Sequence, residues 1–378
     1  MAIEAFDISF GDDELAELRS RLLKARMPLP SGDAGTVGFE PSRLSELVAR
    51  WATTFDWRAQ ERRLNAVPHF RTTGEHPLHF VHLKAASTHA EGLPVLLAHG
   101  WPSSFVEMLP LAERLSAPGR FGGDPRDGRD VVIPSLPGFL FSALQPGPWT
   151  RSGTAELYHR LMTEELGYHR YGAFGGDIGG TVAAWLGAAH PEAVAAIHLI
   201  HPPYPSSFDD PPLTDEERAF LDAEELYDQT DGGYSAIMIT RPDTIAAALI
   251  DSPSGLLAWI ADKWRDWSDC GGELRTRLPD DDLLTLATLY WMTGSIGTSM
   301  RQYVDFRHNP ARPSIAVPAG FTLSSEPGMR GFPRSIAERA CADIVHWSEP
   351  GRGGHFLAWE EPALMADELA ITFRGRRA

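Results

Sequence analysis

Asp177 lies in a glycine-rich stretch, Gly175–Gly180, directly after the apolar run Tyr171–Phe174. The glycines permit a sharp turn from a strand into a helix, which presents one side chain at the top of a parallel sheet. Serine is the usual residue at such a position. A carboxylate there can displace a leaving group from an electrophilic carbon and form a covalent ester that water must later cleave. The alternative interpretation is a glycine-rich turn with a solvated aspartate, and the pattern alone favours neither.

A base is needed to activate the water that cleaves such an ester. His355 is the best candidate, because it follows the last predicted strand in a glycine-rich loop and the histidine comes last in the chain order of folds built on such a turn. The histidine needs a carboxylate that fixes its tautomer. Glu326, after the predicted strand Ile315–Pro318, is the first candidate, and Asp343 and Glu349 are the alternatives. As a loop residue, Glu326 can also be read as a solvated acid.

Backbone N–H groups must stabilise the negative charge that develops on the attacked Asp177 carbonyl. The N–H of Ile178, at the start of the predicted helix, is one donor. Trp101, in the loop after the predicted strand Val95–Ala98, can supply the other. His99 precedes it, and a histidine in this place more often braces the loop, so we expect a structural role for it.

An epoxide is one electrophile that would suit an aspartate nucleophile. Opening its ring releases an alkoxide, so the site would need an acid at the oxygen. Tyrosine phenols suit this task because they stay protonated at neutral pH. Tyr234 and Tyr303 are the candidates, although by composition alone each is more often a packed aromatic residue.

Short apolar runs alternate with helical segments along much of the chain, which predicts a mostly parallel sheet covered by helices. The predicted strands are Pro68–Thr72, Leu78–Lys84, Val95–Ala98, Val131–Ile133, Tyr171–Phe174, Val194–Ile200, Ile315–Pro318 and Ile344–Trp347.

The N-terminal segment is predicted to begin with helices. The first is capped by Asp12 or Asp13. The apolar stripes of the two helices are formed by Leu15, Leu18 and Leu22, and by Leu44, Leu47, Val48, Trp51 and Phe55.

The segment from Pro202 to Pro313 interrupts the series of strands with a helical pattern that is rich in aromatic residues. We interpret it as an inserted cap. Ligands bind beyond the carboxyl ends of the strands in such sheets, so a cap there would cover the site.

Composition limits the classes of function. The chain has 378 residues and a net charge of −17, which argues against nucleic acids and anionic membrane surfaces as partners. Cys270 and Cys341 have no metal-ligand spacing and fit a reducing compartment. The longest apolar runs are too short to span a bilayer, and the N-terminal residues do not read as a signal peptide. We therefore expect a cytoplasmic protein without a membrane anchor, metal or cofactor.

Taken together, these motifs resemble the microsomal-type epoxide hydrolases of the α/β-hydrolase superfamily, and the resemblance covers almost the full length of the chain. The segments that carry it are Trp51–Phe70 for the N-terminal extension, His99–Pro102 for the oxyanion loop, Gly175–Gly179 for the nucleophile turn, Arg241–Pro253 for the cap, and Gly353–Phe356 with Trp359–Pro362 for the histidine loop.

The resemblance implies an ether-bond hydrolase that converts an epoxide to a vicinal diol. Asp177 is then the nucleophile, His355 the general base and Glu326 its acidic partner, while Tyr234 and Tyr303 activate the epoxide oxygen. The family's acid typically follows a Phe-Pro pair, whereas the residues before Glu326 here read Leu-Ser-Ser, so this position departs from the pattern.

The fold that the resemblance implies is an α/β-hydrolase fold with a helical cap and an N-terminal helical extension. We divide the chain into the extension (1–90), the first half of the core (91–202), the cap (203–313) and the second half of the core (314–378). Trp101, Pro102 and Phe139 are expected to contact the substrate.

Aromatic residues in the cap favour a bulky or aryl epoxide, whether a xenobiotic or a natural-product intermediate such as one of enediyne assembly. Water is the second substrate, and the oligomeric state, a homodimer included, is open. A haloalkane dehalogenase is the nearest alternative, but Ile178 stands where such enzymes commonly have a tryptophan that binds halide. An alternative of another class is a catalytically silent ligand-binding homologue.

Overall fold

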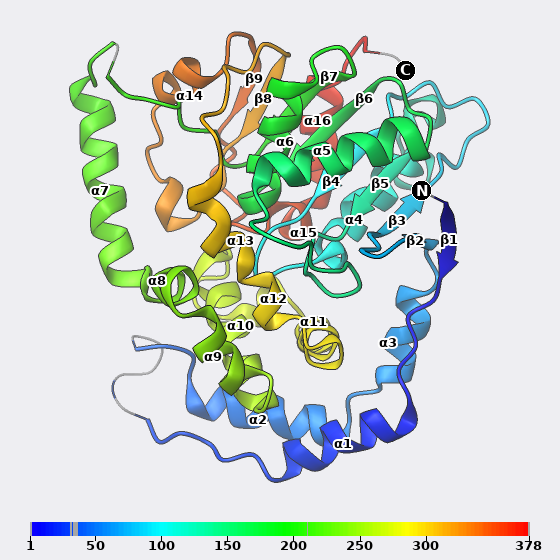
Figure 1. Cartoon of the computed structure of the whole chain (residues 1–378), viewed down its shortest axis with the longest axis vertical. Helices are drawn as coiled ribbons and strands as arrows, with labels where there is room; N and C mark the ends of the chain where they lie inside the picture. The colour runs from blue at the N-terminus through cyan, green and yellow to red at the C-terminus, as the bar shows by residue number, and fades with distance from the viewer. Residues whose placement is uncertain (1, 31, 33–36, 210, 377–378) are drawn as a thin grey trace.

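A nine-stranded sheet forms the centre of the part of the chain that the computed structural model describes, which is residues 2–30, 32, 37–209 and 211–376 (Figure 1). The order of the strands is β1-β2-β3-β5-β4-β6-β7-β8-β9. Pairing is antiparallel from β1 through β3 to β5 and parallel from β5 to β9. The strands are β1 Ile3–Phe6, β2 His69–Thr72, β3 His79–Leu83, β4 Val95–Ala98, β5 Val131–Pro134, β6 Tyr171–Gly175, β7 Val194–Leu199, β8 Ala319–Thr322 and β9 Ile344–Ser348.

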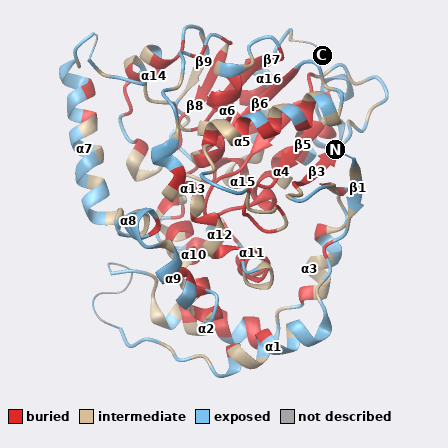
Figure 2. Cartoon of the chain, in the orientation of Figure 1, coloured by how far each residue is buried: buried red, intermediate tan, exposed pale blue. Residues whose placement is uncertain are grey.

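The central strands β4, β6 and β7 are buried along their whole length, as expected of parallel strands that helices cover on both faces (Figure 2). Helices α5 and α6 pack against each other on one face, and α4 packs against α15 and α16 on the other (Figure 1). The helices of the core are α4 Phe105–Ser116, α5 Arg151–Arg160, α6 Asp177–Ala189, α14 Arg334–Ala340, α15 Leu357–Glu360 and α16 Pro362–Thr372.

The predicted helical insertion lies between β7 and β8; in the view of Figure 1 its first helix runs down the left side of the molecule and helices α8 to α12 lie below the sheet. Its helices are α7 Asp215–Asp231, α8 Gly233–Thr240, α9 Pro242–Leu249, α10 Pro253–Trp267, α11 Asp280–Thr293, α12 Ile296–Ser299 and α13 Arg301–Val304. Short 3-10 helices cover Pro118–Phe121, Pro125–Asp127, Leu274–Thr276, Asp305–His308 and Pro327–Met329, and a π-helical turn covers Leu161–Glu165.

The N-terminal extension passes around the far side of this cap. Its helices are α1 Asp12–Leu23, α2 Pro41–Thr53 and α3 Trp57–Leu64, and α1 and α2 lie along the lower edge of the molecule (Figure 1). The predicted stripe of α2 is buried except for Phe55, which lies beyond the end of the helix and is half-buried. The indole N–H of Trp51 donates to the Thr288 hydroxyl of α11 at 3.0 Å. The extension and the cap therefore share a buried interface.

Three details differ from the sequence-based prediction. The chain begins with the strand β1, which pairs with β2 at the edge of the sheet, and not with a helix. Helix α1 has Gly11 at its N-cap, whereas Asp12 and Asp13 lie in its first turn, where carboxylates favour the helix dipole. The strand predicted at Ile315–Pro318 begins only at Ala319: Ile315 forms an isolated bridge to Cys341, and regular pairing starts after Pro318, which has no N–H to donate.

Among the described residues, no single helix has the length and the apolar composition needed to cross a membrane. One pair of consecutive helices, α9 and α10, reaches that composition together, with a bend of 119° between the two.

Candidate active site

Asp177 occupies the turn that the glycine pattern predicts, between β6 and α6. Its φ of 51° lies in the left-handed region, which is costly for a residue other than glycine and asparagine. Close packing explains one glycine of this turn and one of the loop after β4: a Cβ at Gly179 would lie 2.0 Å from the Ala98 carbonyl oxygen, and one at Gly100 would lie 2.4 Å from Oδ1 of Asp177. Both segments thus require glycine where they approach each other beside a half-buried carboxylate.

One oxygen of this carboxylate has a backbone donor. The N–H of Trp101 donates to Oδ1 of Asp177 at 2.8 Å, and Ile178 follows in the first turn of α6. His99 is fully buried; its Nδ1 lies 3.0 Å from the Gly100 carbonyl oxygen and its Nε2 accepts from the Leu136 N–H at 3.1 Å. His99 therefore connects the loops after β4 and β5, and burial lowers its pKa to about 4, in line with a structural role.

His355 and Glu326 come together although they are far apart in the sequence. Nδ1 of His355 lies 2.5 Å from Oε2 of Glu326, and the His355 ring packs against Trp267. Burial lowers the pKa of His355, but the charge of Glu326 and its hydrogen bond, together with the charge of Asp177, outweigh burial and raise the pKa to about 9. Burial opposes ionisation of Glu326 too, yet the neighbouring histidines hold its pKa well below the usual range.

The two alternative acids lie elsewhere. Asp343 is exposed, and the Glu349 carboxylate accepts a hydrogen bond from the Trp347 indole at 2.8 Å. The loop that departs from the family's Phe-Pro pattern therefore still brings Glu326 to His355.

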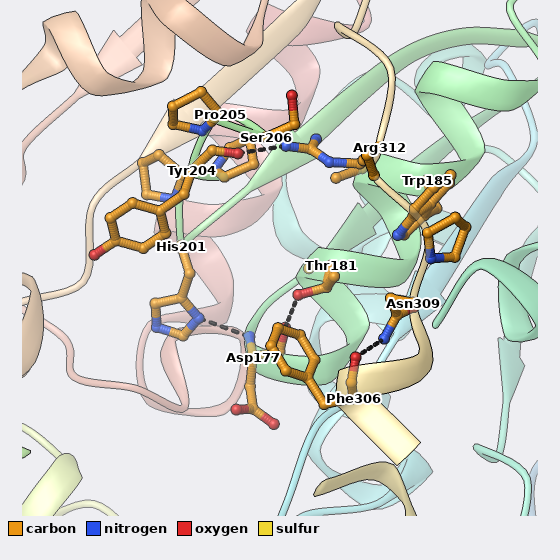
Figure 3. Close-up of a pocket in the computed structure, with 16 residues that line it drawn as sticks. Asp177, Thr181, Trp185, His201, Tyr204, Pro205, Ser206, Phe306, Asn309 and Arg312 are labelled. Carbon is orange, nitrogen blue, oxygen red and sulfur yellow. Dashed lines mark hydrogen bonds between the residues drawn. The ribbon is translucent and has the colours of Figure 1, made fainter. Parts of the chain in front are cut away.

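His201, which sequence reasoning missed, connects the turn at Asp177 to Glu326. Its Nδ1 accepts from the backbone N–H of Asp177 at 2.6 Å (Figure 3). Its Nε2 lies 2.8 Å from Oε1 of Glu326. Because Nδ1 accepts, the proton must be on Nε2, from where it is donated to Glu326. The one available signal was its position two residues after the end of β7, at the carboxyl edge of the sheet.

The cap places its two predicted tyrosines next to the loop of Trp101. The ring of Tyr234 stacks on Trp101 with centroids 5.5 Å apart, and Tyr303 meets the same indole edge-on at 5.9 Å. The two tyrosine rings lie 6.1 Å apart. Burial raises the pKa of both phenols above the usual value, and the charge of Asp177 acts in the same direction, so both phenols stay protonated.

The three residues predicted to contact substrate are all buried. The indole N–H of Trp101 has no hydrogen-bond partner in the part of the chain that the structure describes. Pro102 follows it, and Phe139 packs edge-on against His99 and Tyr290. Phe139 thus lies behind the oxyanion loop, where it supports His99.

Glu107 is a second group that the sequence did not single out. This residue of α4 is 5% exposed, and burial raises the pKa of its carboxyl to about 7, with the charges of Asp177 and Glu360 acting in the same direction. The Glu107 carboxyl group therefore keeps its proton to a higher pH than an ordinary glutamic acid does, and at neutral pH it does not add a full negative charge beside His355.

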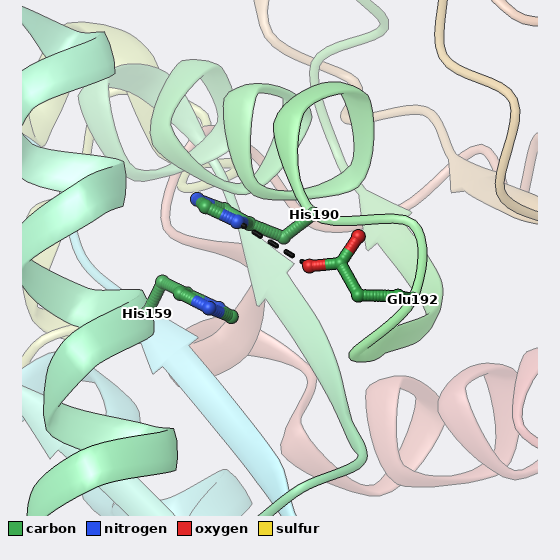
Figure 4. Close-up of side chains that lie close together, drawn as sticks. All are labelled: His159, His190 and Glu192. Carbon is green, nitrogen blue, oxygen red and sulfur yellow. Dashed lines mark ion pairs between the residues drawn. The ribbon is translucent and has the colours of Figure 1, made fainter.

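Two groups of ligand-type side chains occur among the described residues. One is His201, Glu326 and His355, whose facing atoms are used by the hydrogen bonds above. The other is His159, His190 and Glu192 (Figure 4). The two imidazoles of the second group are stacked with centroids 3.6 Å apart and 2° between their planes, so their lone pairs run parallel and would have to turn to converge on an ion.

The order of the strands, the turn at Asp177 and the helical insertion between β7 and β8 define an α/β hydrolase. Residues 94–231 match the family model of the alpha/beta hydrolase fold, and residues 3–108 match that of the epoxide hydrolase N terminus. The chain belongs to the epoxide hydrolase family, as the sequence motifs predicted.

Relatives extend this likeness over nearly the whole chain. A Stigmatella aurantiaca protein, provisionally named an epoxide hydrolase, is 37% identical over 100% of this chain and 86% of its own length. The solved structure of Aspergillus niger epoxide hydrolase is 30% identical, covers 98% of this chain and 95% of its own, and has a TM-score of 0.82. The juvenile hormone epoxide hydrolase of the silkworm Bombyx mori has a TM-score of 0.87 at 28% identity, over 97% of this chain and 93% of its own.

Proposed function

We propose that this protein hydrolyses an epoxide to a vicinal diol through a covalent ester on Asp177. The observation that carries the proposal is that Trp101 contacts both the Asp177 carboxylate and the two cap phenols, while Trp267 links Trp101 to the His355–Glu326 pair. In this proposal the first half of the core (91–202) supplies the nucleophile, the second half (314–378) the base and its acid, and the cap (203–313) the phenols.

In the first step a carboxylate oxygen of Asp177 attacks one ring carbon. The carbon–oxygen bond of the ring breaks, and one of the two phenols, Tyr234 or Tyr303, transfers its proton to the released alkoxide while the other donates a hydrogen bond to it. Because burial raises the pKa of both phenols, both carry their protons before this step.

In the second step water attacks the ester carbonyl of Asp177. His355 takes the proton from this water at Nε2, because its Nδ1 faces Glu326. Negative charge on the carbonyl oxygen is stabilised by the N–H groups of Trp101 and Ile178. Collapse of the tetrahedral intermediate breaks the ester bond, and the leaving oxygen takes the proton from His355, which releases the diol. The new Asp177 carboxyl group gives its proton to the phenolate, which restores both the carboxylate and the phenol.

His355 must be neutral to act in this step. The carboxylate of Asp177 is one of the groups that raise its pKa, and alkylation removes this charge. The pKa of His355 therefore falls when the ester forms, and the imidazole becomes a base at the stage that needs one.

A single turnover in heavy-oxygen water tests the covalent route. With enzyme in excess over styrene oxide, the peptide that contains Asp177 should gain heavy oxygen and the first diol should stay unlabelled. Enzyme kept in heavy-oxygen water without epoxide is the control and should gain no label. Heavy oxygen that enters the first diol directly would contradict the ester.

Dehalogenation is the weaker candidate. The indole N–H of Trp101, which has no partner among the described residues, is free to bind a halide, but halide sites need a second donor, and Ile178 has none in its side chain. Release of halide from chloroalkanes, with no diol from any epoxide, would reverse the choice.

A further inference from the structure

His201 joins two parts of the site that come from separate strands. It follows β7, whereas Asp177 follows β6 and Glu326 follows β8. Backbone pairing holds the end of β7 against the turn at Asp177, because the Ile200 N–H donates to the Gly175 carbonyl oxygen at 3.3 Å. The imidazole of His201 therefore has a fixed place between the nucleophile and the acid.

The side of the ring that faces Asp177 pairs a backbone donor that the helix leaves unsatisfied. Asp177 is the first residue of α6, and the first N–H groups of a helix have no acceptor within the helix. Nδ1 of His201 accepts this N–H at 2.6 Å (Figure 3). The φ of Asp177 is 51°, a strained value that persists only where the surroundings fix it. The bond to His201 is one contact that fixes it, and it thereby holds the carboxylate in place for attack.

The opposite side of the ring binds the acid. Nε2 of His201 lies 2.8 Å from Oε1 of Glu326, and Nδ1 of His355 lies 2.5 Å from Oε2. Each carboxylate oxygen therefore has an imidazole of its own, and the two rings lie 4.8 Å apart. Burial opposes ionisation of Glu326, but the charge of His355 and the hydrogen bonds from both histidines hold its pKa well below the usual range.

Both bonds require the same neutral form of His201. Nδ1 must be free of a proton to accept from Asp177, so Nε2 carries the proton that Glu326 accepts. A doubly protonated ring would lose the bond to Asp177, and a neutral ring with its proton on Nδ1 would lose both bonds. One tautomer of one side chain thus connects the nucleophile to the acid.

We propose that His201 is a positioning residue for both steps of the reaction. Its Nδ1 fixes the backbone of Asp177 for attack on the epoxide. Its Nε2–H fixes the Glu326 carboxylate that orients His355 for hydrolysis of the ester. His201 acts through these two residues and exchanges no proton with the substrate or the water. This inference rests on the proposed hydrolase function.

Two amide substitutions separate the two bonds. His201→Asn keeps an oxygen near the position of Nδ1, which can accept from the Asp177 N–H, but its side chain is too short to reach Glu326. His201→Gln extends its amide to the position of Nε2, where it can donate to Glu326, and it leaves the Asp177 N–H without this acceptor. Each variant therefore retains one bond and loses the other.

Rapid acid quenching of a single turnover of styrene oxide measures both steps. Mass spectrometry of the peptide that contains Asp177 follows the formation and the decay of the ester. His201→Asn should slow decay by about tenfold to a hundredfold, the usual effect of losing a hydrogen bond to a charged group, and change formation by less than about twofold. His201→Gln should slow formation by about threefold to tenfold, the usual effect of losing a neutral hydrogen bond, and change decay by less than about twofold.

Substitutions of His89, an exposed histidine in the loop after β3, are the controls. His89→Asn and His89→Gln should leave both steps at the wild-type rate. Equal slowing of both steps in both His201 variants, the reverse pattern, or no slowing in either variant would overturn the inference and leave the hydrolase function standing. Absence of ester and diol with the wild-type enzyme would instead count against the proposed function.

A measurement on the unsubstituted protein tests the tautomer directly and does not depend on the folding of any variant. With heavy nitrogen in the backbone and in the histidine rings, NMR at neutral pH should show one ring whose Nδ1 is coupled to the Asp177 amide across their hydrogen bond. The same ring should carry its proton on Nε2. Absence of this coupling, or a proton on Nδ1 of His201, would overturn the inference.

Discussion

The charges of Glu326 and Asp177 both raise the pKa of His355, so the proposed esterification of Asp177, which removes one of these charges, would change the protonation of His355. Glu326 is held ionised by two histidines, and His355 lies against it at 2.5 Å. Because the folded pKa of His355 is raised to about 9, its protonated form adds stability that is fully present below the unfolded value near 6.5 and is lost as pH rises through 9. The depressed pKa of Glu326 acts in the opposite sense, with stability present above its unfolded value and lost as pH falls.

Asp177→Asn is predicted to lower the pKa of His355. The substitution removes one of the charges that raise this pKa and keeps the side chain's shape, so it imitates the neutral ester. Histidine ring NMR over a pH series measures the shift, and the exposed His89, which lies in a different loop, is the internal control. An unchanged His355 pKa would show that Asp177 does not regulate the base.

The sequence was sufficient to predict some residues of this site and not others. Asp177 and His355 could be predicted because each lies in a glycine context with a fixed place relative to a strand. His201 could not, because its role depends on the second oxygen of Glu326 and on the backbone N–H of Asp177, which are distant in the sequence. Glu107 looked like an ordinary helix residue, and only its burial distinguishes it.

At the scale of elements, the contact of β4 with the start of α6 sets the position of Asp177. Strand β4 pairs with β6 in parallel, and its end meets the first turn of α6 so closely that no side chain fits at Gly179. The same closeness lets Trp101, which follows β4, donate to Asp177. Close packing of the backbone therefore aligns the Asp177 carboxylate with its N–H donor.

Gly179→Ala is predicted to destabilise the fold by about 3 kcal/mol, the upper end of the usual range for overpacking, because its Cβ would meet the Ala98 backbone at 2.0 Å. Denaturant melts measure the loss. Gly233→Ala in α8 is the matched control: nothing lies within 4 Å of its added Cβ, and alanine is favoured over glycine in a helix by about 1 kcal/mol. Equal behaviour of the two variants would refute the packing argument.

The sequence predicted the elements of the buried core well and its edges poorly. Strand β4 matches its predicted bounds because every residue in it is apolar and buried. Strand β1 was missed because it is short and half of it is exposed, so its sequence carries no pattern of burial. The shift at β8 follows from Pro318, since hydrophobicity alone does not show which residue can donate to a neighbouring strand.

At the scale of the whole molecule, the N-terminal extension holds the cap from the side opposite to the sheet. Arginines of α1, α2 and α3 pair with aspartates of the cap. The pairs are Arg21–Asp251, Arg43–Asp280, Arg50–Asp281 and Arg63–Asp282. Pairs of this exposure contribute little each, so the buried apolar face of α2 supplies most of the stability of the interface. Because the cap carries Tyr234 and Tyr303, the extension affects the geometry of the site through the cap.

Trp51→Ala is predicted to destabilise the cap more than the core. Trp51 is 5% exposed and its indole donates to Thr288 of α11, so Trp51→Ala should lower the free energy of unfolding by about 3–5 kcal/mol. Trp51→Phe is the control: it keeps a ring and loses the hydrogen bond, so it should cost about 1 kcal/mol. Hydrogen exchange should show faster exchange of α10 and α11 amides in Trp51→Ala, with β6 and β7 unaffected. Misplaced phenols should then lower kcat more than they raise KM, since they act on the opening ring. Uniform loss of protection across sheet and cap would instead mean that the two unfold as one unit and that the extension stabilises the whole chain.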